Sequence, residues 1–356
     1  MSFKFIDLFA GIGGIRIAFE TAGGTCVFSS EYDRFAQLTY RAFFGEKPDF
    51  ASILSTNPPG DITKIAPELI PDHDILTGGF PCQPFSIAGV SKKNSLGRPH
   101  GFDDPTQGTL FFNVKEIIKA KQPKAFLLEN VKNLKNHDRG RTYRIIEETL
   151  KDLDYEIFSR VIDANGWVPQ HRERIYIVGF RKPDGKQKWG INSFNELFDL
   201  KPPVRGVSLE SILENEVPER YTLTEKTWAT LERHKKFHLE QGNGFGYGLI
   251  SPPFEGKITR TISARYHKDG AEILLDQDQI MKRPRRLTPY EASGLMGFPE
   301  NYRKYFSRLP NIKQPVSDTQ AYRQFGNSVA VPVVADIAKI VINKLFEVGA
   351  FSPEKH

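Results

Sequence analysis

The first half of this 356-residue chain alternates short apolar runs with amphipathic stretches, and that alternation restricts the possible folds more than any other feature. Between residues 3 and 180, strand-like runs are FKFIDLFAG, TCVFSSEYD, HDILTGGFP, AFLLENV and RIYIVGF. The stretches between them have helical spacing: GIRIAFETAG, RFAQLTYRAFFG, GTLFFNVKEIIKAK and RTYRIIEETLKDL. Repeated strand-helix units predict an α/β fold with a mostly parallel sheet and helices on both faces.

The character of the sequence changes after residue 180. Residues 181–284 contain KPPVRG, GNGFGYG and charged segments, with few long apolar periods, which predicts a smaller, irregular, partly β domain. In residues 285–356, TPYEASGLMGF predicts a short helix, and the last two thirds of NSVAVPVVADIAKIVINKLFEV predict a longer one. We expect three parts, namely a first domain over 1–180, a second over 181–284, and a tail over 285–356 that returns to the first.

Composition narrows the class of protein. Lys and Arg number 49 against 43 Asp and Glu, a mild basic excess that fits a polyanionic partner without requiring one. The only cysteines, Cys26 and Cys82, cannot build a disulfide framework, and no CxxC pair exists for zinc, so we expect a reducing, cytoplasmic setting and no metal. The start MSFKFIDLFAG has no signal-peptide pattern, and no apolar run reaches about 18 residues. Neither export nor membrane insertion is expected.

The segment FIDLFAGIGGIRIAFE predicts a strand that ends in a tight glycine turn before a helix. The glycines, Gly11 and Gly13 among them, do not form GxGxxG, and a turn without a ligand is the alternative interpretation. After the second strand, Glu31 falls where doubly wound folds hold ribose hydroxyls, and Tyr32 could stack on a purine. In GDIT, Asp61 could accept a hydrogen bond from an adenine amino group.

Two residue types that carry chemistry follow strands further along the chain. Cys82, in GGFPCQPFS, is either an inert buried thiol or a nucleophile on a constrained loop, whereas Cys26 has apolar neighbours and is predicted to be core. Glu129, in AFLLENV, either caps the next turn or donates a proton to a ring under attack. In QHRERIYIVG, alternation places Arg172 and Arg174 on one face, which suits a phosphate, a carbonyl oxygen or simple solvation.

Taken in order, eight motifs resemble those of the DNA (cytosine-5)-methyltransferases of bacterial restriction-modification systems. They are DLFAGIGG, EYD, GDIT, GFPCQPFS, ENV, QHRERIYIVG, RRLTPYEASGLMGFP and RQFGNSVAVPVV. The resemblance covers residues 5–180 and 285–345. It implies a Rossmann-like domain that binds S-adenosylmethionine and acts on double-stranded DNA.

The resemblance also assigns a cofactor pocket. Phe9 and the glycine turn would line the methionine side, Glu31 the ribose, Tyr32 and Ile62 the adenine faces, and Asp61 the adenine amino group. The remaining expected cofactor-binding residues are Gly11, Gly13, Pro81, Asn327, Ser328 and Val329.

The implied mechanism is covalent. Cys82 would add to C6 of the cytosine, Glu129 would hydrogen-bond or protonate N3, and Arg174 would hold the carbonyl oxygen of the base. Arg172 would help to order a loop or a phosphate. Because the ring cannot be reached inside a duplex, the cytosine must turn out of the helix, which costs a few kcal/mol.

DNA contacts are expected from two regions. The first is the loop after Cys82, with Ser86, Lys92, Lys93 and Arg98, although a loose loop extension is the alternative. The second is the target recognition domain over 181–284. There KITRTISARYHK predicts a strand with Lys257, Thr259, Thr261, Ser263 and Arg265 on one face, with a blunted edge strand as the alternative. The expected contacts in this domain are Asn243, Phe245, Lys257, Arg260, Thr261 and Arg265, of which Arg265 best suits guanine.

One motif departs from the family pattern. Tyr290 and the pair Ser293-Gly294 stand where arginine, alanine and arginine are frequent, so the local charge network differs, but no matched catalytic position is altered. The alternatives are an enzyme of the same fold that acts on tRNA, a nucleotide-dependent oxidoreductase, and an inactive DNA-binding module. We expect a monomeric methylase paired functionally with a restriction endonuclease.

Overall fold

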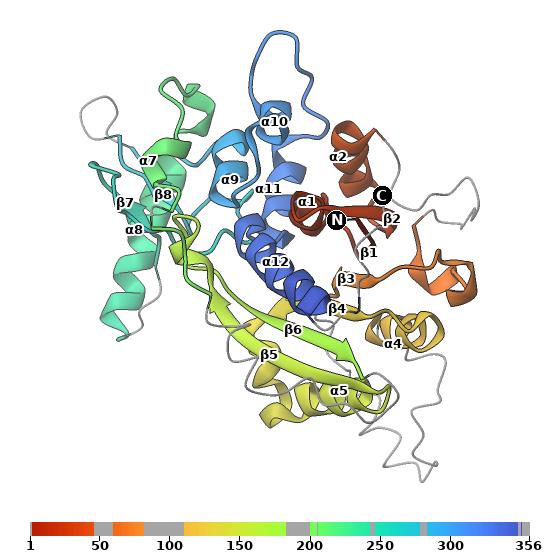
Figure 1. The fold of residues 1–356 in the computed structure, drawn as a ribbon. Helices are drawn as coiled ribbons and strands as arrows, with labels where there is room; N and C mark the ends of the chain where they lie inside the picture. The colour runs from red at the N-terminus through yellow and green to blue at the C-terminus, as the bar shows by residue number, and fades with distance from the viewer. Residues whose placement is uncertain are drawn as a thin grey trace.

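The computed structural model describes residues 2–45, 60–81, 110–182, 200–204, 206–242, 246–277, 283–347 and 350. Its centre is a six-stranded sheet in the order β2-β1-β3-β4-β6-β5 (Figure 1). The strands are β1 (Phe3–Leu8), β2 (Gly24–Ser30), β3 (Ile75–Gly79), β4 (Ala125–Val131), β5 (Tyr155–Asp163) and β6 (Glu173–Arg181).

Strands β1 to β4 are parallel to their neighbours, whereas β6 runs antiparallel to both β4 and β5. The predicted α/β fold with a mostly parallel sheet is therefore confirmed, and the five predicted strands are all present. The sequence analysis missed β5. Only nine residues, 164–172, connect β5 to β6, which is too short for a parallel crossover and makes the pair antiparallel.

Alternating side chains of the strands divide the core into two layers. Phe3 and Phe5 of β1 pack with helices α1 (Gly14–Thr21) and α12 (Val331–Glu347) on one face. Ile6 and Leu8 pack with α4 (Leu110–Lys121) and α5 (Arg141–Lys151) on the other. Helix α12 lies against α1, so the C-terminal helix packs on the helix that follows β1.

A second group of elements lies to one side of the main sheet (Figure 1). It comprises α7 (Leu209–Ile212), α8 (Glu225–Glu240) and a two-stranded sheet of β7 (Leu249–Ile250) and β8 (Leu274–Leu275). Helices α9 (Pro289–Leu295), α10 (Glu300–Arg303) and α11 (Asp318–Asn327) follow in the sequence. One continuous apolar core joins both groups, because Ile212, Ile262 and Leu275 belong to the same buried cluster as α12.

The prediction of a strand over KITRTISARYHK is wrong. The segment makes a single bridge, Thr259 to Gln170, and then turns from Ser263 onward. Thr259 is 1% exposed, so it cannot share an exposed face with Lys257 and Arg265. The backbone of Thr259 is held by residues 169–171. Thr259 N donates to Pro169 O at 2.9 Å, and His171 N donates to Thr259 O at 2.9 Å.

Candidate active site

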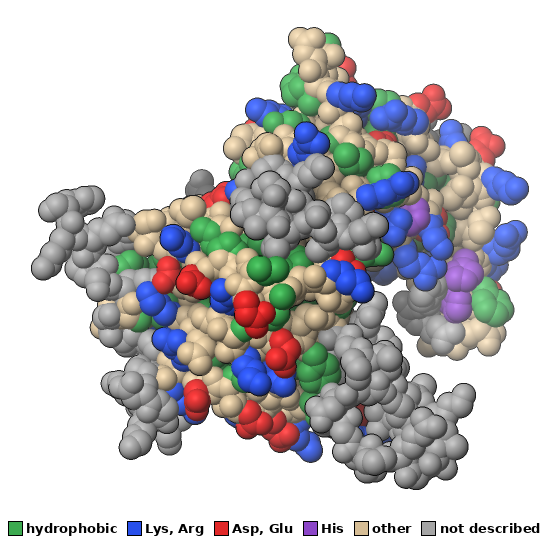
Figure 2. Space-filling view, turned by 90° about the vertical axis from the view of Figure 1, so that its right-hand side faces the viewer, with side chains coloured by type: hydrophobic (Ala, Val, Ile, Leu, Met, Phe, Trp, Pro, Cys, Tyr) green, Lys and Arg blue, Asp and Glu red, His purple; other side chains and the backbone are tan. Residues whose placement is uncertain are grey.

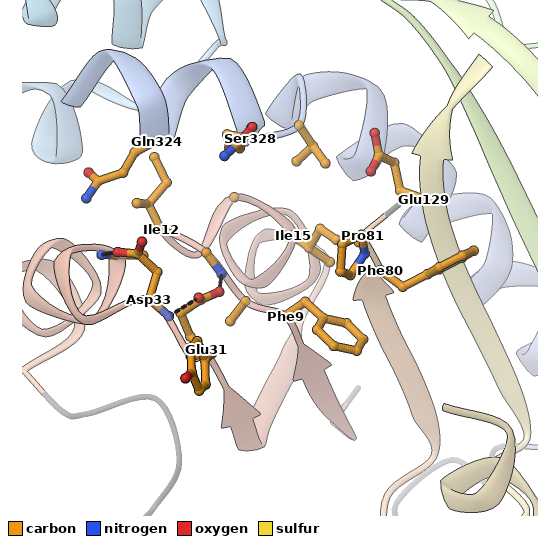
Figure 3. A pocket seen from close by; sticks show the side chains of 18 of the residues that line it. Phe9, Ile12, Ile15, Glu31, Asp33, Phe80, Pro81, Glu129, Gln324 and Ser328 are labelled. Atoms are coloured by element: carbon orange, nitrogen blue, oxygen red, sulfur yellow. Dashed lines mark hydrogen bonds between the residues drawn. The ribbon is translucent and has the colours of Figure 1, made fainter. Parts of the chain in front are cut away.

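A cavity of about 800 Å³ opens at the carboxyl ends of β1 to β4 (Figure 3). Parallel strands bring the loops that follow them to one edge of the sheet, which is where doubly wound folds bind ligands. The lining includes Phe9, Gly11, Glu31, Tyr32, Asp61, Ile62, Pro81, Glu129, Arg174, Gln324, Asn327, Ser328 and Val329. Residues predicted from separate motifs therefore line the same cavity.

The turn from β1 to α1 forms the floor of this cavity. Gly13 has φ of 83°, and a Cβ there would lie 2.2 Å from a ring carbon of Phe44, so the position requires glycine. Gly14 faces the returning C-terminal part, since a Cβ would lie 3.0 Å from Ser328 Oγ. The turn and residues 328–329 are therefore in direct contact, although about 300 residues separate them in the sequence.

Glu31 is held by the backbone at the end of β2. Its Oε2 accepts a hydrogen bond from Gly11 N at 2.7 Å and its Oε1 accepts one from Asp33 N at 2.7 Å (Figure 3). Burial raises the pKa of the Glu31 carboxyl above its ordinary value, while these two bonds act in the opposite direction. The carboxylate is thus fixed beside the glycine turn, and Tyr32 next to it remains 64% exposed.

Asp61 precedes the short helix η1 (Ile62–Lys64) and caps it. Oδ1 accepts both bonds, from Thr63 N at 3.0 Å and Thr63 Oγ1 at 2.7 Å. Within the described residues both bonds go to Oδ1, so Oδ2 can accept from a ligand, and the neighbouring Ile62 is buried and lines the cavity. These positions suit a flat ring between Tyr32 and Ile62.

Glu129 and Arg174 form an ion pair at the deep end of the cavity. Glu129 pairs in register with Gly79 of β3 and Tyr176 of β6, and Arg174 Nε lies 3.1 Å from Glu129 Oε1. Burial raises the pKa of the Glu129 carboxyl, and the guanidinium groups of Arg174 and Arg172 oppose that rise. A raised pKa in a cleft is typical of a group that transfers protons.

The side chain of Asn130 hydrogen-bonds the backbone at Phe80, two residues before Cys82. Its Nδ2 donates to Phe80 O at 2.8 Å, and its Oδ1 accepts from Val131 N at 2.9 Å. The bond links the ends of β3 and β4 immediately before Pro81, which lines the cavity. Asn130 belongs to the motif ENV, for which the sequence analysis assigned a role to Glu129 alone; the available signal was a polar side chain after an apolar run.

Arg172 has different surroundings from Arg174. It is 1% exposed, and its guanidinium donates to the carbonyl oxygens of Ile262 (3.2 Å), Gly326 (3.0 Å) and Ser328. Burial, together with the charge of Arg174, lowers the pKa of Arg172 to about 9, so it stays charged at neutral pH. Its contacts are protein carbonyls inside the core, where no DNA phosphate can reach.

Gln324 is a pocket residue that the motif reading missed. It lies one helical turn before Asn327 on α11, accepts a 2.8 Å bond from Thr39 Oγ1 at its Oε1, and is 8% exposed (Figure 3). Its Nε2 has no hydrogen-bond partner within the described part of the chain. Helical spacing from Asn327 was the signal that could have identified it.

The expected DNA contacts are only partly described. Lys257, Arg260 and Arg265 are exposed and Thr261 is half-buried, with Arg260 Nη1 donating to Gly246 O at 2.6 Å. Figure 2 shows Lys and Arg side chains concentrated on the upper right-hand part of this face, near the histidines. The remaining expected residues lie outside the described residues: Cys82, Ser86, Lys92, Lys93, Arg98, Asn243 and Phe245.

The departures in the TPYEASGLMGFP motif are accommodated by a neighbouring arginine. Arg303 lies over the ring of Tyr290 at 4.1 Å, and its guanidinium would be 3.0 Å from a Cβ on Gly294. Arg285 and Glu291 form a buried bidentate pair beside them. In the ranges that the structure covers, no group of three or more potential metal ligands occurs, and no helix is long and apolar enough to cross a membrane.

Fold and site together define an α/β group-transfer enzyme. The cavity at the carboxyl ends of the parallel strands contains the ion pair of Glu129 and Arg174, which can donate hydrogen bonds or a proton to a substrate. Comparison with known proteins narrows this class. The family model described as C-5 cytosine-specific DNA methylase matches residues 3–343.

Relatives that match nearly the whole of this chain agree. A DNA-cytosine methyltransferase of Escherichia coli K12 is 46% identical over 99% of this chain and 80% of its own. The type II methyltransferase M1.ScrFI of Lactococcus lactis subsp. cremoris is 48% identical over 96% and 79%. The solved structure of S. pombe Dnmt2 methyltransferase shares the fold, with a TM-score of 0.69 at 18% identity over 99% of this chain and 100% of that one. This chain belongs to the C-5 cytosine-specific DNA methylase family.

Proposed function

We propose that the cavity binds S-adenosylmethionine beside a cytosine turned out of duplex DNA, and that the chain methylates C5 of that cytosine within a short specific sequence. The single observation that carries this proposal is the Glu129–Arg174 pair, which lines the same cavity as Glu31 and the glycine turn. Methylation of cytosine C5 in DNA is the activity of the family; the residue roles are our proposal.

The donor set fits S-adenosylmethionine. The fixed carboxylate of Glu31 suits a ribose diol, Tyr32 and Ile62 suit the two faces of adenine, and the free oxygen of Asp61 suits its amino group. The lining residues Phe9, Gly11, Pro81, Asn327, Ser328 and Val329, with Gly13 in the same turn, would complete the site. When bound, the cofactor supplies an electrophilic methyl group.

Cytosine C5 is too weak a nucleophile to take that methyl group unaided, so we propose covalent activation. The chain reaches the cavity at Pro81, and the next residue is Cys82. The Cys82 thiolate adds to C6, and the electron pair of the C5–C6 double bond becomes available at C5. Glu129 gives a proton or hydrogen bond to N3, and Arg174 holds the carbonyl oxygen at C2.

Release restores the starting enzyme. After C5 has gained its methyl group, a base removes the C5 proton, the electron pair reforms the C5–C6 double bond, and the Cys82 sulfur departs as thiolate. Glu129 takes back the proton that it gave to N3. The pocket thus ends with methylated cytosine and a free thiolate.

The test uses tritiated S-adenosylmethionine with duplex DNA and tRNA as separate acceptors. We expect label in DNA only; label in tRNA only would support the rival tRNA enzyme, and no label in either would reject methyl transfer. Bisulfite sequencing of DNA from a host that expresses the chain then identifies the sequence recognised.

We further propose that the enzyme acts as a monomer in the bacterial cytoplasm, without a metal, and protects DNA against a restriction endonuclease. For the protective role, support comes from relatives that are named type II methyltransferases. Protection is checked by challenging DNA from the expressing host with endonucleases that cut the sequence found by bisulfite analysis. Gel filtration with and without duplex tests the monomer.

A further inference from the structure

One buried guanidinium is shared by two parts of the molecule with different tasks. Arg172 Nη1 donates to Ile262 O at 3.2 Å, and Ile262 belongs to the region predicted to recognise DNA. Arg172 Nη2 donates to Gly326 O at 3.0 Å and to Ser328 O, and Gly326 and Ser328 line the cofactor cavity. A planar guanidinium keeps its two nitrogens at a fixed separation, so the two sets of carbonyls are held in one geometry.

The segment around Ile262 cannot move independently, because a second buried side chain, that of Gln170, also holds the backbone of Ile262. Its backbone nitrogen donates to Gln170 Oε1 at 2.9 Å, while Gln170 Nε2 donates to Leu295 O at 3.1 Å. Gln170 is 0% exposed, so this contact, like that of Arg172, is closed to water. Both backbone groups of Ile262 are therefore held by buried side chains from the connection between β5 and β6.

Gly326 packs directly on the same segment. A Cβ at Gly326 would lie 2.3 Å from Ser263 C and 2.3 Å from Ala264 N, so there is no free space between them. A displacement of residues 262–264 must push the end of α11 and with it the wall of the cavity. Two residues beyond Arg172, Arg174 makes the ion pair with Glu129.

We propose that Arg172 is a positioning residue that couples DNA binding in the recognition region to cofactor binding in the cavity. DNA that shifts residues 262–264 moves the Arg172 guanidinium, and the carbonyls of Gly326 and Ser328 follow it. By thermodynamic linkage, DNA then raises cofactor affinity by the same factor by which cofactor raises DNA affinity. The proposal rests on the proposed function, since it needs both ligands to bind this chain.

The experiment measures that factor with ligands that do not react. Calorimetry gives the Kd of S-adenosylhomocysteine for the full chain, free and saturated with a duplex that carries the sequence mapped by bisulfite analysis, and the Kd of the duplex with and without S-adenosylhomocysteine. We expect one factor from both directions, between about 5 and 150, the usual range of coupling. In Arg172→Lys, a single ammonium cannot hold both sets of carbonyls. The coupling factor should therefore fall to within about twofold of one.

Arg285→Lys is the matched control. Arg285 is also a buried arginine, 8% exposed, but its partner is Glu291 and it has no contact with the cavity. Arg285→Lys should lower the midpoint of urea unfolding and leave the coupling factor at its wild-type value. If the role of Arg172 is purely structural, Arg172→Lys lowers the affinity for both ligands but leaves the coupling factor at its wild-type value. This result would overturn the proposal.

A second measurement needs no variant. In wild-type protein, S-adenosylhomocysteine alone should slow hydrogen exchange of the amides of residues 259–264, which do not line the cavity. Unchanged exchange there, or a wild-type factor of one, also rejects the coupling. Wild-type methyl transfer to duplex DNA is recorded in parallel, so that a failed coupling with intact transfer is distinguished from failure of the proposed function.

Discussion

Glu129 lies in an environment unlike that of an ordinary surface carboxylate. It is 8% exposed, burial raises its pKa, and Arg174 holds one of its oxygens. A raised pKa keeps more of the carboxyl group protonated near neutral pH, which is the form that can give a proton to N3.

We therefore predict that Glu129→Gln lowers kcat for methyl transfer by about 10²- to 10⁴-fold, the usual contribution of a general acid or base. Initial-rate measurements with tritiated S-adenosylmethionine check this. The control is Glu173→Gln, because Glu173 lies on the same sheet but pairs with Lys132 at the surface. Near-normal turnover of Glu129→Gln would remove Glu129 from the mechanism.

Asp7 on β1 predicts a pH dependence of stability. It is 0% exposed, and burial raises its pKa from 3.8 to about 7, although Thr77 and Arg16 act against the rise. Between about pH 4 and 7 the folded protein therefore holds a proton that the unfolded chain has released. The contribution of Asp7 to stability therefore falls as pH rises through this window and levels off above it.

The expected result is a free energy of unfolding that declines from pH 5 to pH 7.5 in wild type. Asp7→Asn should show a flatter profile over the same range, since Asn does not titrate. Urea unfolding at a series of pH values measures both. An identical slope in the two proteins would show that Asp7 is not the group responsible.

At the scale of elements, the turn between β1 and α1 determines the shape of the cavity floor. Gly13 and Gly45 both have positive φ, 83° and 75°, but only Gly13 is crowded. A Cβ on Gly13 would meet Phe44 at 2.2 Å, whereas one on Gly45 would meet nothing within 4 Å. The two glycines thus separate backbone strain from overpacking.

Gly45→Ala should lower the free energy of unfolding by about 1–2 kcal/mol, the strain of a left-handed residue. Gly13→Ala should lose about 1–3 kcal/mol more through overpacking and weaken cofactor binding as well. Urea unfolding and calorimetry with S-adenosylhomocysteine measure these effects. Equal losses for the two variants would show that the contact with Phe44 relaxes without penalty.

The elements also show how far sequence patterns reach. Buried strands such as β3 and β4 were predictable because each begins with a short run of buried apolar side chains and turn residues bound it. Edge strand β5 was missed because most of its side chains are only half-buried and Glu156 and Arg160 interrupt the apolar pattern. Helix α8 was missed because none of its side chains is buried, so no period appears.

Motif residues were easier to place than their partners. Glu31 and Glu129 follow strands, and parallel strands end at one edge, so their convergence on one cavity followed from the sequence. The surroundings of Arg172 did not, because its acceptors are backbone carbonyls at Ile262, Gly326 and Ser328, and backbone groups leave no mark on residue type.

At the scale of the whole molecule, one apolar core joins the main sheet to the second group of elements, which contains α7 and β8. This continuity gives Arg265, exposed on the turn after Thr261, a fixed position relative to the cavity. If Arg265 contacts guanine, Arg265→Ala should reduce discrimination between the correct and a mismatched sequence by about 1–3 kcal/mol. Bisulfite sequencing of host DNA measures site choice, and an unchanged pattern would assign Arg265 to the DNA backbone or to solvent.

The central claim is that a cysteine forms a transient bond to C6 of the target base. Duplexes with 5-fluorocytosine at the target position have no proton to lose from C5, so the adduct should persist when S-adenosylmethionine is present. We predict a denaturation-resistant protein–DNA complex that mass spectrometry maps to Cys82, and no complex with Cys82→Ser. Methyl transfer at normal rates on ordinary duplexes, with no trapped complex on fluorinated ones, would contradict the account.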